Sequence, residues 1–118
     1  MSMRYVLFCF SAVALLAQQN TELAQALDSS RQRIDSIDGQ IVKLLNERAQ
    51  VVREVGLIKK QFHAPVSAPG REEQVLHRAG GQARAPLTDS AVEAIYKTIL
   101  HEMSRMEETE MQKASSPP

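Results

Sequence analysis

The 118-residue sequence has no tryptophan, one cysteine and five aromatic side chains, and its 14 basic residues equal its 14 acidic ones. The single cysteine, Cys9, excludes an intramolecular disulfide and a cysteine-based zinc site. Balanced charge without any run of lysine or arginine argues against a dedicated nucleic-acid-binding protein. Because 43% of the residues are hydrophobic, we expect an aliphatic core in one domain of about 100 residues.

The first 17 residues have the pattern of an export signal. Arg4 precedes an uncharged stretch, residues 5–17, which ends at Ala17 before polar Gln18. A basic start, an apolar segment of about 7–15 residues and a small residue at the junction are typical of a signal peptide. We therefore expect cleavage of residues 1–17 and a periplasmic or secreted mature protein with no stable membrane anchor. The alternative is the start of a buried helix in a cytoplasmic protein.

Residues 21–61 contain no proline, and their apolar residues recur at alternating steps of three and four. This pattern predicts a helix of about 40 residues, near 60 Å long, with a coiled-coil-like seam. Arg48 fills the one place in the series that lacks an apolar side chain. The apolar members are Ile34, Ile37, Ile41, Leu44, Val51, Val55 and Ile58.

Two shorter helices are predicted after this one. A proline-rich turn leads into a helix over about residues 69–79, which Gly80 and Gly81 end. A second connector leads to a helix that Thr88, Asp89 or Ser90 can cap, with Ser90 and Glu93 spaced as a capping box. We expect the folded domain to cover residues 18–113 and the tail, residues 114–118, to be disordered.

The sequence shows no strand alternation and no glycine-rich phosphate loop, so we predict an all-α fold with one long, one short and one medium helix. Three helices of such unequal length bury too little apolar surface in a single chain. We therefore expect an intertwined homodimer in which the long helices pair.

Cations lie on or beside the apolar stripe of the long helix. Arg48 and Lys59 are eleven residues apart, which is three turns, so both point the same way about 16 Å apart. They can frame one elongated pocket. Arg31 is rotated by roughly 100° from Arg48 and lies about 25 Å away, so it can more easily enter the pocket of an antiparallel partner. The alternative is that Arg48 sets the coiled-coil register and the other two cations are solvated or ion-paired.

Five blocks of residues, in order and with matching spacing, resemble the all-helical (type II) chorismate mutase family. The similarity covers about residues 27–108. The blocks are Arg31-Gln32-Arg33-Ile34-Asp35-Ser36-Ile37-Asp38, Leu44-Leu45-Asn46-Glu47-Arg48, Val55-Gly56-Leu57-Ile58-Lys59, Pro65-Val66 and Arg71-Glu72. The resemblance implies an isomerase that converts chorismate to prephenate in a helical homodimer, as in phenylalanine and tyrosine biosynthesis, without a metal or cofactor.

The resemblance also implies a role for each matching residue. Arg31 of the partner chain and Arg48 would bind carboxylates, and Lys59 would contact a carboxylate and the ether oxygen. Arg71 would support the ring carboxylate and Glu72 would accept a hydrogen bond from the substrate hydroxyl. The catalytic set would be Arg48, Lys59 and Glu107.

The sequence departs from the family pattern at three places. Ala68 stands where an aspartate usually caps the second helix, a loss of about 1 kcal/mol that Ser67 can offset. Met103 stands where many relatives have serine, and Glu107 where many have glutamine beside the ether oxygen. Glu107 must be protonated to donate there. It follows the inward stripe of the third helix, and the alternative is a surface acid.

Two other functions compete with the mutase. Isochorismate-pyruvate lyase shares this fold and its use of cations, and the unusual Ala68-Pro69 loop is compatible with this alternative. The second is a secreted helical dimer without catalytic activity. A full set of inward-facing cations destabilises a protein that binds no anion. This argues against the dimer without catalytic activity.

Overall fold

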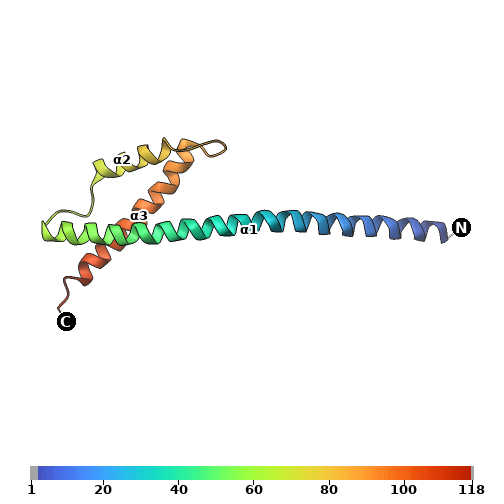
Figure 1. Ribbon diagram of the computed structural model, residues 1–118, viewed down its shortest axis with the longest axis horizontal. Coiled ribbons are helices and arrows are strands. Elements are labelled where there is room, and N and C mark those ends of the chain that lie inside the picture. Colours follow the sequence, from blue (N-terminus) through green and yellow to red (C-terminus); the bar gives the residue numbers. More distant parts are fainter. Residues whose placement is uncertain (1–2, 118) are drawn as a thin grey trace. The chain divides into compact units, whose positions relative to one another are not determined.

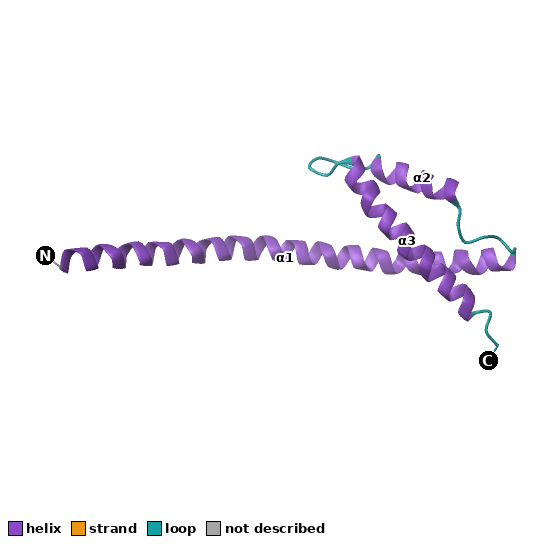
Figure 2. Cartoon of the chain, turned by 180° about the vertical axis from the view of Figure 1, so that it is seen from behind, coloured by secondary structure: helices purple, strands orange, loops and turns teal. Residues whose placement is uncertain are grey.

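The computed structural model describes the backbone of residues 3–117 and the side chains of residues 12–117. It contains three helices, α1 (Met3–Gln61), α2 (Pro69–Gly80) and α3 (Asp89–Lys113), and Figures 1 and 2 show helices and connecting loops only over this range. The predicted all-α fold is confirmed. The chain divides after Leu44 into two compact units.

Helix α1 has 59 residues and begins earlier than the sequence pattern predicted. Residues 5–17 contain neither proline nor glycine and are rich in alanine and leucine, so nothing in the first segment interrupts a helix that starts there. The predicted signal peptide falls largely on residues 1–11, whose side chains lie outside the described part, and its cleavage stays a prediction. Within the described residues, no helix has a stretch apolar and long enough to cross a membrane.

The first unit is the part of α1 that ends at Leu44, and its apolar stripe is open to solvent. Exposure along the stripe runs from 49% at Ile41 to 63% at Leu44. Across residues 12–117, Ala79 is the only buried apolar residue of the isolated chain. One chain therefore lacks the core that a stable domain of this size needs.

The turn after α1 folds the following connector back onto the helix end. His63 takes a positive φ of 54°, a left-handed conformation that commonly ends helices. The amide of Ala64 donates to the carbonyl of Lys59 at 2.8 Å. The Lys59 ammonium in turn donates to the carbonyl of Val66 at 2.7 Å. These bonds fix the connector beside the last turn of α1.

Helix α2 begins without a side-chain cap. Ala68 occupies the cap position and makes no side-chain hydrogen bond, and the prediction that Ser67 would take over this role is wrong. The carbonyl of Ala68 accepts from the amides of Arg71 and Glu72, both at 3.0 Å. Proline at the first helical position has no amide that needs a partner. These backbone features offset part of the stability that α2 loses without a side-chain cap.

Helix α3 begins at a threonine cap. Thr88 is extended, and its hydroxyl accepts from the amide of Ala91 at 3.2 Å. The predicted capping box of Ser90 and Glu93 is wrong, because Ser90 already lies inside the helix. Glu93 instead packs against α2, where a Cβ placed on Gly80 would lie 2.8 Å from its Oε1 atom. The absence of a side chain at Gly80 therefore lets α3 approach the end of α2.

Helix α3 ends at Lys113, where the amide of Ala114 donates to the carbonyl of Glu110 at 3.1 Å. Residues 114–117 continue as a turn and a bend. The domain bounds of residues 18–113 and the disorder expected for residues 114–118 stay predictions, and Pro118 lies outside the described residues.

The two assignments of the α3 cap predict different effects of mutation. Thr88→Ala removes the hydroxyl that accepts from Ala91 and should lower the free energy of unfolding by about 1 kcal/mol, measured by urea denaturation followed by circular dichroism. Ser90→Ala is the control and should lower it less, because it removes only the exposed 3.2 Å contact between the Ser90 and Thr88 hydroxyls. A larger loss from Ser90→Ala would contradict the Thr88 cap.

Candidate active site

A cavity of about 290 Å³ lies in the second unit, between the last part of α1, the connector, α2 and α3. Its apolar wall comes mainly from valines of α1 and from Leu100 and Met103 of α3. Its polar groups come from all three helices. The lining residues are Arg48, Val51, Val52, Val55, Lys59, Val66, Ala68, Arg71, Glu72, Val75, Leu100, Met103, Ser104 and Glu107.

Arg48 and Lys59 line the same cavity, as their helical spacing predicts. Arg48 is half-buried, and its Nη1 atom is buried without a hydrogen-bond partner. A guanidinium nitrogen in that state has lost water and gained nothing in return. Because Arg48 lines the cavity, a rotation of its guanidinium would bring this unpaired donor to an anion there.

Lys59 is held on two sides. Besides donating to Val66, its Nζ atom lies 2.9 Å from Oε1 of Glu107, and the two side chains are only 21% and 7% exposed. The same Oε1 atom has no hydrogen-bond partner of good direction. We therefore treat the contact as an ion pair whose carboxylate oxygen keeps unused hydrogen-bonding capacity.

Glu107 is buried, at 5% exposure, so it is not the solvated surface acid of the alternative interpretation. Glu110, one turn later, behaves differently. It lies 3.4 Å from Arg53 and 2.9 Å from Lys113. The hydrogen bond and charge of Lys113 lower the pKa of Glu110. Within this stretch of α3, Glu107 is the acid that reaches the cavity.

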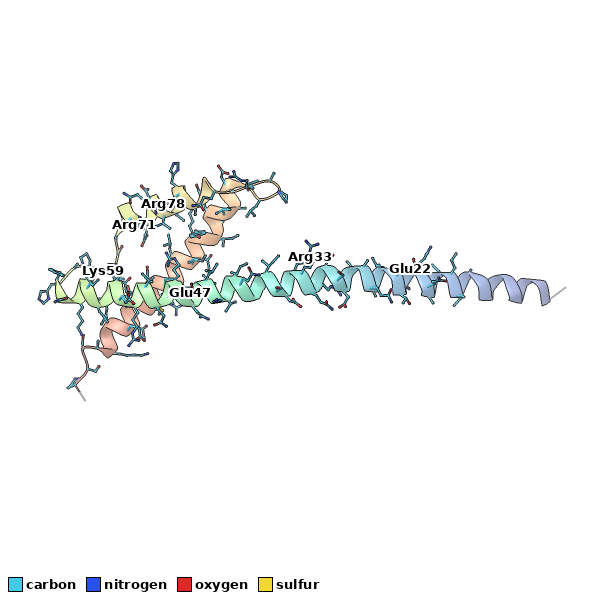
Figure 3. All side chains as sticks on the ribbon, in the orientation of Figure 1. Glu22, Arg33, Glu47, Lys59, Arg71 and Arg78 are labelled. Carbon is cyan, nitrogen blue, oxygen red and sulfur yellow. The ribbon has the colours of Figure 1, made fainter. Side chains whose placement is uncertain are left out.

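Arg71 and Glu72 come from the first turn of α2 and complete the charged lining. Figure 3 shows Arg71 near the start of α2 and Lys59 near the end of α1. The cavity thus has three cations and two carboxylates, with one carboxylate already paired to Lys59. Such a balance suits a ligand with more than one negative charge.

Arg31 is the one predicted site residue that does not line this cavity. It belongs to the first unit, whereas every lining residue belongs to the second. Among the described residues, no group of three or more histidine, cysteine or acidic side chains is placed to hold a metal ion.

Two parts of the cavity were missed by sequence reasoning. The Val66 carbonyl that holds Lys59 is a backbone group, which no residue pattern reveals. Ser104 lines the cavity beside Met103 and follows Leu100 by four residues, so its position on the inward stripe was a usable signal.

The buried pair of Lys59 and Glu107 should behave unlike an exposed pair. Lys59→Met leaves a buried carboxylate without its partner and should lower the free energy of unfolding by about 3 kcal/mol. Adding Glu107→Gln should recover most of that loss, because no uncompensated charge remains. Lys113→Met is the control, since Lys113 lies at the same 2.9 Å from Glu110 but is 69% exposed, and exposed pairs contribute little. Urea denaturation measures all three, and equal effects of the two lysines would contradict the buried pair.

Comparison with known proteins identifies the family. Residues 30–109 match the family model of chorismate mutase type II. Among curated relatives, the chain is 36% identical over 77 residues to the bifunctional chorismate mutase/prephenate dehydratase of Neisseria gonorrhoeae, covering 65% of this chain. It is 40% identical over 67 residues to a 3-dehydroquinate dehydratase of Pyrobaculum aerophilum, covering 57% of this chain. The chain spans only about a fifth of these two relatives, 21% and 22% of their lengths.

Solved structures share the fold. A chorismate mutase from Helicobacter pylori in complex with prephenate has a TM-score of 0.69 at 23% identity, over 75% of this chain and 96% of that one. The form II chorismate mutase of Thermus thermophilus has a TM-score of 0.67 at 27% identity, over 70% of this chain and 93% of that one. With a family match across most of its length and three helices arranged alike, the chain belongs to the type II chorismate mutase family.

Proposed function

We propose that this protein is an isomerase, a chorismate mutase that rearranges chorismate to prephenate for phenylalanine and tyrosine biosynthesis. The observation that carries the proposal is the buried, unpartnered Nη1 atom of Arg48 in the same cavity as Lys59. A site of this kind can bind and orient an anion. Family membership names the anion for which this arrangement is suited.

The reaction needs positioning and electrostatics only. Chorismate is a dicarboxylate that must fold into a compact conformer, in which an ether C–O bond breaks while a C–C bond forms. Fixed cations that hold both carboxylates in the folded conformer supply the orientation. Donors aimed at the ether oxygen stabilise the negative charge that develops there. Residues of this chain can perform both tasks without a cofactor.

Each charged residue of the cavity has a proposed task. The Arg48 guanidinium forks onto a substrate carboxylate, using the nitrogen that has no partner in the free chain. Lys59, already oriented by Val66, bridges a carboxylate and the ether oxygen. Arg71 supports the ring carboxylate, and Glu72 accepts from the substrate hydroxyl.

Glu107 has a different task. Its Oε1 atom lies 2.9 Å from Lys59, which places the carboxyl beside the group that meets the ether oxygen. An ionised carboxylate would repel the charge developing on that oxygen, whereas a protonated carboxyl donates to it. We therefore assign Glu107 the second donor in the reaction, with a proton on its carboxyl, a state in which its contact with Lys59 is a hydrogen bond and not the ion pair of the free chain.

Isochorismate-pyruvate lyase is the second candidate function, and the presence of alanine at position 68 favours it. Ala68 lines the cavity at the place where the family pattern has a polar residue near the substrate hydroxyl. The lyase would release salicylate and pyruvate from isochorismate. The loss of one polar contact changes how tightly the hydroxyl is held, and the cations serve either substrate equally.

We further propose that the chain works as a homodimer with two shared sites. Each apolar residue of the stripe from Ile34 to Leu44 is at least 49% exposed. Burial of this stripe against a second copy of the chain would remove its apolar surface from water and stabilise the pair. Arg31 lies before this stripe and would enter the partner's cavity, bringing the fourth cation.

We also propose export to the periplasm or exterior, from the pattern of residues 1–17. The alternative is that the protein stays in the cytoplasm with these residues attached, and mass spectrometry of the N-terminus distinguishes the two.

Activity assays with Arg48 variants test the function. The wild type should form prephenate from chorismate and no salicylate from isochorismate. Arg48→Met should lower kcat/KM by about 100-fold or more, since it removes a preorganised charge contact. Its free energy of unfolding should change little, because the buried Nη1 atom has no partner to lose and methionine keeps an apolar stem at this position. Arg53→Met, on the exposed side of α1, is the control with near wild-type kcat/KM. Salicylate formation would favour the lyase, and unfolding of Arg48→Met would favour a register role for Arg48.

Mixing two inactive variants tests the shared site. Arg31→Ala and Arg48→Ala should each have little activity alone. Unfolded together and refolded, they should regain about a quarter of wild-type activity, because half of the dimers are mixed and each mixed dimer has one intact site. No recovery would show that both residues act in the same chain's site, or that the chains do not pair.

A further inference from the structure

The last part of α1 crosses α3 (Figure 1). Gly56 lies at this contact, where it faces Glu107 and Met111 of α3. It is buried and is not among the residues that line the cavity. A Cβ placed on Gly56 would lie 2.9 Å from Cγ of Glu107 and 3.5 Å from Cγ of Met111. The first of these separations is shorter than carbon atoms tolerate, so any side chain at position 56 must displace Glu107 or α3.

Gly56 and Lys59 are three residues apart on α1 and so are neighbours on its surface. The methylene groups of Glu107 lie over Gly56, and its carboxylate reaches Lys59 at 2.9 Å. The contact between these two site residues thus depends on the space that Gly56 leaves. Movement of the Glu107 Cγ atom moves the carboxylate with it.

The intrinsic preference of the helix does not account for this glycine. Glycine inside a helix is destabilising relative to alanine, so its presence at a buried crossing needs a reason in packing. Gly39 offers the contrast, because it is exposed and nothing lies within 4 Å of its would-be Cβ atom. Alanine fits at position 39 and does not fit at position 56.

We propose that Gly56 is a positioning residue that sets the place of the Glu107 carboxyl relative to Lys59 in the reaction. It does not line the cavity and acts through Glu107. This inference rests on the proposed mutase function. It adds that the approach of α3 to α1, set by one missing methyl group, determines how well the second donor meets the ether oxygen.

A double-mutant cycle in the full-length chain tests the proposal. The variants are Gly56→Ala, Glu107→Ala and their combination, measured for kcat, KM and melting temperature. Gly56→Ala alone should lower kcat by about 10- to 100-fold, the cost of misplacing a catalytic group by about 1 Å, with a smaller change in KM. In the Glu107→Ala background, where the Cγ atom is gone, Gly56→Ala should change kcat by less than about twofold.

Two matched variants separate positioning from general damage. Glu107→Gln keeps the Cγ atom, so Gly56→Ala should lower kcat in that background as strongly as in the wild type. Gly39→Ala should leave kcat unchanged and raise the melting temperature, because alanine favours the helix at an open position. If Gly56→Ala alone fails to fold, the combination with Glu107→Ala should fold, since the crowded atom has been removed.

The outcomes distinguish this inference from the proposed function. An equal loss of kcat from Gly56→Ala with and without the Glu107 side chain would overturn it, as would an unchanged kcat in the single variant. A wild-type chain that forms no prephenate would contradict the proposed function instead. The melting temperatures would still test the packing, because Gly56→Ala should lower the value only where residue 107 retains its Cγ atom.

Discussion

The contact between Lys59 and Glu107 is the constraint on which the second unit depends. It joins α1 to α3 through a 2.9 Å ion pair that is largely removed from water. A side chain at position 56 would crowd the Glu107 side chain, and glycine leaves the space that it occupies. The ion pair is also coupled to the connector, because Lys59 donates to Val66. Buried pairs of this kind are costly to break and contribute little to net stability when intact, so its value is that it fixes the arrangement of helices around the cavity.

Arg48, unlike Lys59, is a partly buried cation with an unpaired nitrogen atom. Its Nη1 atom is buried without a partner, which destabilises the free chain to a modest extent. A cation that has already lost water needs little further desolvation when an anion arrives, which favours electrostatic catalysis. With the proposed function, binding of the substrate would recover the stability that this unpaired nitrogen costs the free chain.

Helical periodicity predicted three helices in the observed order, and the eleven-residue spacing placed Arg48 and Lys59 on one wall. Other features depend on contacts between segments far apart in the sequence. Thr88, Asp89 and Ser90 all suit a helix cap, and only the path of the connector selects Thr88. The role of Val66 belongs to its carbonyl, which every residue has. The space at Gly56 matters because Glu107 lies over it, and that pairing is visible only once the helices are packed. Arg31 does not line the cavity of its own chain, and its place in a partner's cavity stays a prediction.

The position of Arg48 within the apolar series connects the fold to the proposed chemistry. The series runs through Ile41 and Leu44 to Val51 and Val55, and Arg48 takes the place where another aliphatic residue would strengthen the seam. A charged residue at such a position weakens helix pairing. In the proposed dimer, the same pairing would withdraw Arg48 further from water and so strengthen its attraction to a substrate carboxylate. Zero net charge over the chain is compatible with this, because binding depends on where three cations gather and not on the total. In that dimer, the seam would give up some stability at position 48, and the cavity would gain a cation there.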